Sequence, residues 1–132
     1  MNYLGIDYWT KKSWIAVNFS GIAMPLSIVS TDTLINEIMK LITERKIETI
    51  VLWVADHPDW RISEISKKIR VFSGILAKRL PIWVNVILHD ERFTSFEAVK
   101  SLEMAWVKKF DPNHLDDMAA SIILQSYIDS VN

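Results

Sequence analysis

Short apolar runs and longer stretches with apolar residues every three or four positions divide this chain into predicted strands and helices. Three short runs come first, separated by only a few residues, and they predict an antiparallel meander of strands at residues 3–8, 13–19 and 23–29. Pro25 has no amide hydrogen to donate, which favours an edge position for the third of these strands.

The remainder of the chain alternates between helices and strands. A helix begins at Ser30 or Thr31, because the residues that follow form one apolar face: Leu34, Ile38, Leu41 and Ile42. The continuous apolar run 49–54 is typical of a central parallel strand that is covered on both faces. Further elements are then predicted in the order loop 56–60, helix 62–80, strand 82–88, a short helix from Thr94, and a last helix from Asp111-Pro112 to about residue 131.

This order predicts a single domain, residues 1–132, of the α/β class, with a mixed five-stranded sheet flanked by helices. Half of the 132 residues are hydrophobic, which is enough to bury a core. No apolar run reaches the roughly 18 residues of a membrane helix, and the first residues do not resemble a signal peptide. With no cysteine to form disulfides, we expect a cytoplasmic protein.

Acidic residues from three distant segments are the candidates for chemistry. Asp7 ends the first predicted strand, Asp90 and Glu91 follow the last strand, and Asp116 lies in the last helix. Parallel strands gather ligands at their carboxyl ends. Carboxylates without thiolate partners suit Mg²⁺ or Mn²⁺, and such sites hydrolyse phosphodiesters. The sequence therefore predicts a metal-dependent nuclease, although Asp7 could instead be a turn residue, and Asp90 and Glu91 a solvated pair.

Helical spacing distinguishes Asp116 from its neighbour Asp117. Asp116 shares a stripe with Ala119, Ala120 and Ile123, so it faces the sheet, where an uncompensated charge is costly. Of the three histidines, none has a partner at the spacing of a zinc site. His89 is either a turn residue or a neighbour of the metal site.

Charge does not by itself indicate a nucleic-acid-binding protein, because the net charge is -1. Binding must depend on local patches. The pair Lys11-Lys12 is the best candidate, since its turn follows Asp7 directly and could meet a phosphate backbone. The other basic pairs are typical of solvated faces.

Five segments, taken in order, resemble the YqgF/RuvX family of RNase H-like nucleases, which is related to the Holliday junction resolvases. They are LGIDYWTKKSWIAV at 4–17, GIAMPL at 21–26, IVLW at 50–53, DERFTS at 90–95 and LDDMAASIILQSY at 115–127. The resemblance covers nearly the whole chain.

The resemblance implies an RNase H fold and a nuclease with a two-metal mechanism. It implies that Asp7, Glu91 and Asp116 are the catalytic and metal-binding acids, for Mg²⁺ or Mn²⁺, with Asp90 in support. Lys11, Arg92 and Thr94 would contact the nucleic acid. The substrate would be the 5′ end of the 16S rRNA precursor or, alternatively, a four-way DNA junction, and the protein a monomer or homodimer. A further alternative is a degenerate domain that binds nucleic acid without cleaving it.

The chain departs from the family pattern in having six tryptophans and only three glycines. Trp9, Trp14 and Trp53 occupy glycine positions of the family motifs, and Trp60 replaces the glycine of a turn. Trp83 and Trp106 complete the six. We hypothesise that the gene comes from a lineage that reads UGA as glycine. Base stacking on Trp9 or Trp60 and ordinary core packing of Trp14 or Trp83 are the alternatives. Tryptophan in a glycine conformation predicts a strained or displaced backbone at Trp9 and Trp60.

The codons of the gene test this hypothesis directly. We expect UGA at all six tryptophan positions, which would mean that the natural protein has glycine there, an open metal site and nuclease activity. UGG codons would contradict the hypothesis and would favour the domain that binds without cleaving.

Overall fold

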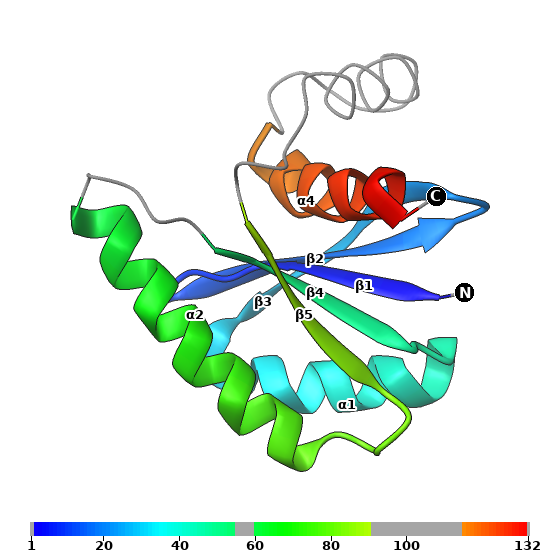
Figure 1. The fold of residues 1–132 in the computed structure, drawn as a ribbon, viewed down its shortest axis with the longest axis horizontal. Helices are drawn as coiled ribbons and strands as arrows, with labels where there is room; N and C mark the ends of the chain where they lie inside the picture. Colours follow the sequence, from blue (N-terminus) through cyan, green and yellow to red (C-terminus); the bar gives the residue numbers. More distant parts are fainter. Residues whose placement is uncertain (1, 55–59, 91–114, 132) are drawn as a thin grey trace.

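The structure is a computed structural model that describes residues 2–54, 60–90 and 115–131. Five strands form one sheet with the spatial order β3-β2-β1-β4-β5 (Figure 1). They are β1 (Tyr3–Asp7), β2 (Lys12–Phe19), β3 (Ile22–Ser30), β4 (Thr49–Val54) and β5 (Asn85–Asp90). Strands β1, β2 and β3 pair antiparallel, whereas β4 pairs parallel with both β1 and β5. The mixed five-stranded sheet predicted from the sequence is confirmed.

Helices cover both faces of the sheet. The helices are η1 (Thr31–Thr33), α1 (Leu34–Arg45), α2 (Trp60–Arg79) and α4 (Leu115–Val131). Figure 1 shows α1 and α2 on one face and α4 on the other. Strand β4 serves both cores, because Leu52 packs with the side chains under α1 and α2 while Val51 packs with those under α4. Among the described helices, none is long and apolar enough to cross a membrane.

Two element starts differ from the predictions by two residues or more, and β5 also ends at Asp90 rather than at residue 88. Helix α2 begins at Trp60 rather than at residue 62, and β5 begins at Asn85 rather than at residue 82. Asn85 pairs with Thr49, the first residue of β4, so β5 starts where its partner starts. The Val84 N–H instead closes a turn onto the Pro81 carbonyl, at 3.0 Å. The residues between them, Ile82 and Trp83, are exposed.

Pro25 lies in β3, which is an edge strand as predicted. Its register with β2 shifts between Ile15 and Ala16, which pair with Ser27 and Pro25 and leave Leu26 as an extra residue. A bulge of this kind is a usual way for an edge strand to accommodate proline. The helix predicted from Thr94 and the Asp111 cap lie outside the described residues.

Helix α4 approaches the backbone of β1 at Gly5. A β-carbon built on Gly5 would lie 2.7 Å from Leu124 Cβ and 3.0 Å from the Ala120 carbonyl oxygen. At the start of the strand, the Tyr3 ring packs edge-on against Tyr127, with centroids 5.7 Å apart. Glycine is therefore required at position 5, because any side chain would push the helix away from the sheet.

Thr31 holds the turn between β1 and β2. Its backbone N–H donates to the Lys11 carbonyl at 2.9 Å, and its hydroxyl donates to the Trp9 carbonyl at 2.6 Å. Since that hydroxyl proton is used, the buried Ser13 hydroxyl is the donor in its 2.8 Å bond to Thr31 Oγ1. These bonds attach the turn after Asp7 to the end of β3.

The strain expected at Trp9 and Trp60 is not found. In the described part of the chain, positive φ occurs at Ser20, Gly21 and Lys46, and Trp9 is not among these residues. Trp60 is the first residue of α2. The backbone accepts tryptophan at both positions, which counts against the glycine hypothesis there.

Gly5→Ala should destabilise the protein by about 1–3 kcal/mol, because the new methyl group overpacks the contact with α4. Gly74→Ala is the matched control. Gly74 lies within α2, and apart from its chain neighbours and the adjacent helix backbone, no atom of the described residues lies within 4 Å of the place that its β-carbon would take. Alanine there should stabilise by up to about 1 kcal/mol. Urea unfolding of the three proteins measures both changes, and equal effects at the two positions would contradict the close approach at Gly5.

Thr31→Val should cost about 1–2 kcal/mol of unfolding free energy, because it leaves the buried Ser13 hydroxyl and the Trp9 carbonyl without their partner. Thr31→Ser keeps the hydroxyl and should retain most of the stability. Two variants of equal stability in urea unfolding would show that the hydroxyl does not hold the turn.

Candidate metal centre

Three parallel strands end at the same edge of the sheet. Strands β1, β4 and β5 finish at Asp7, Val54 and Asp90, and we call this the carboxyl edge. Figure 1 shows the first residues of α4 above this edge. Segments that are far apart in the sequence therefore meet where α/β proteins bind their ligands.

Asp7 points to the α4 face of the sheet. The missing side chain of Gly5 would point into α4, and side chains two residues apart on a strand share a face. Asp7 is buried, with 7% of its surface exposed. A carboxylate in such a place is costly unless it is compensated, which is typical of a functional group rather than of a turn residue.

A row of four side chains crosses the sheet at the level of Asp7. Trp14 on β2 pairs with Asp7, and Trp53 on β4 pairs with His89 on β5. Ile6 pairs with Leu52, so the next residues, Asp7 and Trp53, lie side by side. We call Trp14, Asp7, Trp53 and His89 the Asp7 row. Both tryptophans are half-buried and pack with the core under α4, so an indole lies on each side of the acid.

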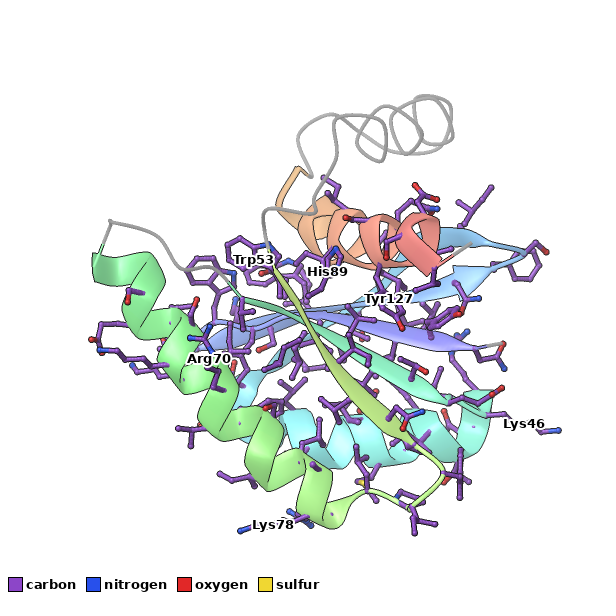
Figure 2. The ribbon with its side chains drawn as sticks, viewed as in Figure 1. Lys46, Trp53, Arg70, Lys78, His89 and Tyr127 are labelled. Atoms are coloured by element: carbon purple, nitrogen blue, oxygen red, sulfur yellow. The ribbon has the colours of Figure 1, made fainter. Side chains whose placement is uncertain are left out.

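His89 attaches the end of β5 to α4. Its ring is buried, and its Nε2 lies 2.9 Å from Ser126 Oγ. The ring also packs edge-on against Tyr127, with centroids 5.9 Å apart, and Figure 2 shows both side chains between the sheet and α4. His89 is therefore a strand residue and not the turn residue that was one of its two interpretations. It joins the two elements that carry Asp90 and Asp116.

The backbone of Asp116 lies one helical turn before Ala120. Four helical residues rise about 6 Å, and two strand residues rise about 6.6 Å. Since the Ala120 carbonyl contacts Gly5, the turn before it comes level with Asp7, two residues beyond Gly5. The structure therefore brings the start of α4 to the Asp7 end of β1.

Of the other predicted site residues, Asp90 and Lys11 belong to the described part of the chain. Asp90 is the last residue of β5, and Lys11 is exposed in the turn that Thr31 holds. Glu91, Arg92 and Thr94 lie outside the described residues. Within the described side chains, no group of three or more acidic, histidine or cysteine residues forms a metal site.

Sequence reasoning missed two polar groups on α4 and one aromatic residue directly after β1. Ser126 bonds to His89, and Gln125 accepts the Ala23 N–H at 2.8 Å. Polar residues within a buried helical stripe were the signal for both. Tyr8 packs its ring against Phe72, with centroids 4.9 Å apart, and burial, together with the charge of Asp32, raises the pKa of Tyr8.

Comparisons with known proteins agree with this arrangement. Residues 1–130 match the family described as "RuvX: Holliday junction resolvase". A protein of Bacteroides fragilis named "Putative pre-16S rRNA nuclease" is 35% identical over 132 residues, covering 96% of this chain and 95% of that protein. A protein of the same name from Rickettsia canadensis is 34% identical over 136 residues, covering 97% of this chain and 86% of that protein.

Solved structures show the same fold. T. thermophilus RuvC, solved in complex with Holliday junction substrate, superposes with a TM-score of 0.68 at 13% identity, covering 99% of this chain and 94% of that one. Fowlpox virus resolvase, solved with Holliday junction DNA, gives a TM-score of 0.56 at 14% identity, covering 99% of both chains. The RNase H-like fold that the resemblance implied is confirmed. With a family match over almost its full length, the chain belongs to the RuvX family.

Proposed function

We propose that this protein is a metal-dependent endonuclease that hydrolyses phosphodiester bonds of nucleic acid in the cytoplasm. The observation that carries the proposal is the buried carboxylate of Asp7 at the carboxyl edge, level with the start of α4. The family match gives independent support. The preferred substrate is the 16S rRNA precursor, in line with the name "Putative pre-16S rRNA nuclease" that the relatives carry, and the expected place of cleavage is its 5′ end.

Asp7, Glu91 and Asp116 would hold Mg²⁺ or Mn²⁺, with Asp90 supporting them. An oxygen-only donor set fits hard divalent cations. Two such ions supply a water nucleophile and charge stabilisation at the leaving oxygen when bound. Asp7 enters the site with its position fixed, because β1 is paired on both sides and α4 lies on its backbone.

Lys11, Arg92 and Thr94 would bind and orient the nucleic acid. Lys11 is suited to a phosphate contact, because it is exposed four residues after Asp7 and its backbone is fixed by Thr31. A fixed backbone lets an exposed lysine meet a phosphate with less loss of freedom than a loose turn would.

Two alternatives remain alongside RNA processing. The fold shared with two proteins solved with junction DNA favours a Holliday junction resolvase, which would act as a homodimer rather than a monomer. The indoles of Trp14 and Trp53 beside Asp7 favour a domain that binds nucleic acid without cleaving it, because they occupy space next to the acid.

Asp7→Asn should reduce metal-dependent cleavage by at least about a hundredfold, which corresponds to about 2.7 kcal/mol of transition-state stabilisation. The assay uses a 5′-extended 16S rRNA precursor fragment and a four-way DNA junction, each with Mg²⁺ and with chelator. Glu44→Gln, at an exposed acid in α1, is the control and should cleave like the wild type.

The pattern of cleavage separates the candidate functions. Cleavage of RNA alone supports precursor processing, and cleavage of the junction alone supports a resolvase. Binding without cleavage by the wild type would identify the non-catalytic domain. Cleavage that survives both Asp7→Asn and chelator would contradict a metal-dependent nuclease.

A further inference from the structure

Helix α2 carries an unusual concentration of positive charge. Its twenty residues include six lysines and arginines and a single acid, Glu64, whereas the whole chain has a net charge of -1. Figure 2 shows two of these basic residues, Arg70 and Lys78, on α2, which covers the face opposite to α4. A local positive surface on a nearly neutral protein is typical of a site for a polyanion.

A surface pocket lies between α2 and the end of β1. Its volume is about 290 Å³, and we call it the Tyr8 pocket after the residue that follows β1 and lines it. The pocket is lined by Tyr8, Lys67, Lys68, Val71, Phe72 and Ile75. Val71 is 63% exposed and Ile75 49% exposed, so an apolar surface stands open to solvent beside two lysines.

The Tyr8 pocket adjoins the candidate metal centre across the carboxyl edge. Tyr8 follows Asp7 directly, and consecutive side chains of an extended chain point to opposite faces. Asp7 faces α4, while Tyr8 packs on Phe72 of α2. A nucleic-acid strand with one phosphate at Asp7 would therefore reach the Tyr8 pocket by crossing the edge of the sheet.

We propose that the Tyr8 pocket binds an unpaired nucleotide of the substrate, next to the nucleotide that is cleaved. The base would pack on Tyr8, Val71 and Ile75, and the backbone phosphate would lie at Lys67 and Lys68. This proposal deepens the nuclease function and rests on it for the identity of the substrate.

The lining of the Tyr8 pocket is suited to both parts of a nucleotide, the base and the phosphate. An aromatic and apolar surface accepts any base by stacking, and neighbouring lysines neutralise the phosphate. Lys67 pairs with Glu64 at 3.2 Å, but both side chains are more than half exposed, so this ion pair contributes little and is readily exchanged for a phosphate.

A second copy of the chain is the competing occupant of this surface. Val71 and Ile75 could pack against the same residues across a two-fold axis. Such a dimer would, however, bring two α2 helices together, each with six basic residues and one acid. Their repulsion opposes the contact, whereas it favours a polyanion in the same place.

The test measures binding in the absence of metal, so it does not depend on cleavage. A labelled single-stranded RNA is titrated with the full-length protein in chelator at several salt concentrations. Lys67→Ala/Lys68→Ala should weaken binding about tenfold or more and reduce the salt slope by about 0.7, which is the contribution of one phosphate contact on a single strand. Lys40→Ala/Lys46→Ala, which removes two exposed lysines at α1 on another surface, should change the affinity less than about twofold.

Stacking in the pocket has its own pair of variants. Tyr8→Leu should weaken binding of single-stranded RNA about fivefold or more, since stacking contributes about 1–3 kcal/mol per base. Tyr8→Phe keeps the ring and should bind like the wild type. Circular dichroism checks that Tyr8→Leu folds, and the lysine variants test the pocket without touching the core.

Two results would overturn the proposal. One is unchanged affinity and salt slope in Lys67→Ala/Lys68→Ala. The other is a wild-type dimer in sedimentation that Val71→Lys converts to monomer, which would assign the pocket to a second copy. If the wild type does not cleave, but its RNA binding still depends on Lys67, Lys68 and Tyr8, the result would count against the nuclease function alone.

Discussion

The contact between α4 and the backbone of β1 at Gly5 determines the geometry of the candidate site. Because no side chain separates the two, the height and direction of the helix are set by main-chain and Leu124 atoms rather than by a flexible contact. Two further hydrogen bonds hold the helix in place. Gln125 Oε1 accepts from the Ala23 N–H, and Ser126 Oγ bonds to His89 Nε2. These contacts fix the start of α4 relative to Asp7, which a metal site built from distant segments requires.

Side chains alternate at the end of β1, and this places Asp7 and Tyr8 on opposite faces of the sheet. Asp7 lies on the α4 face, where it is buried. Tyr8 lies on the α2 face, where it lines the Tyr8 pocket together with Lys67 and Lys68. The carboxylate of Asp7, a candidate metal ligand, and the lysines of the Tyr8 pocket therefore lie on opposite faces of the sheet. The overall charge of -1 conceals the strongly basic character of α2, because acidic residues elsewhere in the chain offset it.

The sequence predicted the parts of this structure that depend on local pattern and missed those that depend on distant partners. Pro25 indicated the edge strand, and the apolar run of β4 indicated its central place. The start of β5 was misplaced because Ile82 and Trp83 are apolar yet exposed, and the register with β4 decides where the strand begins. Strain at Trp9 was inferred from a family motif, but the turn that Thr31 holds leaves that residue without a positive φ. The fold alone brings Thr31 to this turn, so its role is not visible along the chain.

The Asp7 row makes the identity of residues 14 and 53 decisive for the chemistry of the site. Trp14 and Trp53 lie on either side of Asp7 and pack under α4. Two indoles there shield the carboxylate and restrict the approach of a phosphate, whereas two glycines would leave the same acid open on both sides. The backbone of the sheet is paired in the same way in both cases, since strand pairing uses no side chain at these positions. One fold thus supports an open acid suited to hydrolysis or a shielded acid suited to binding, and the side chains on β2 and β4 select between them.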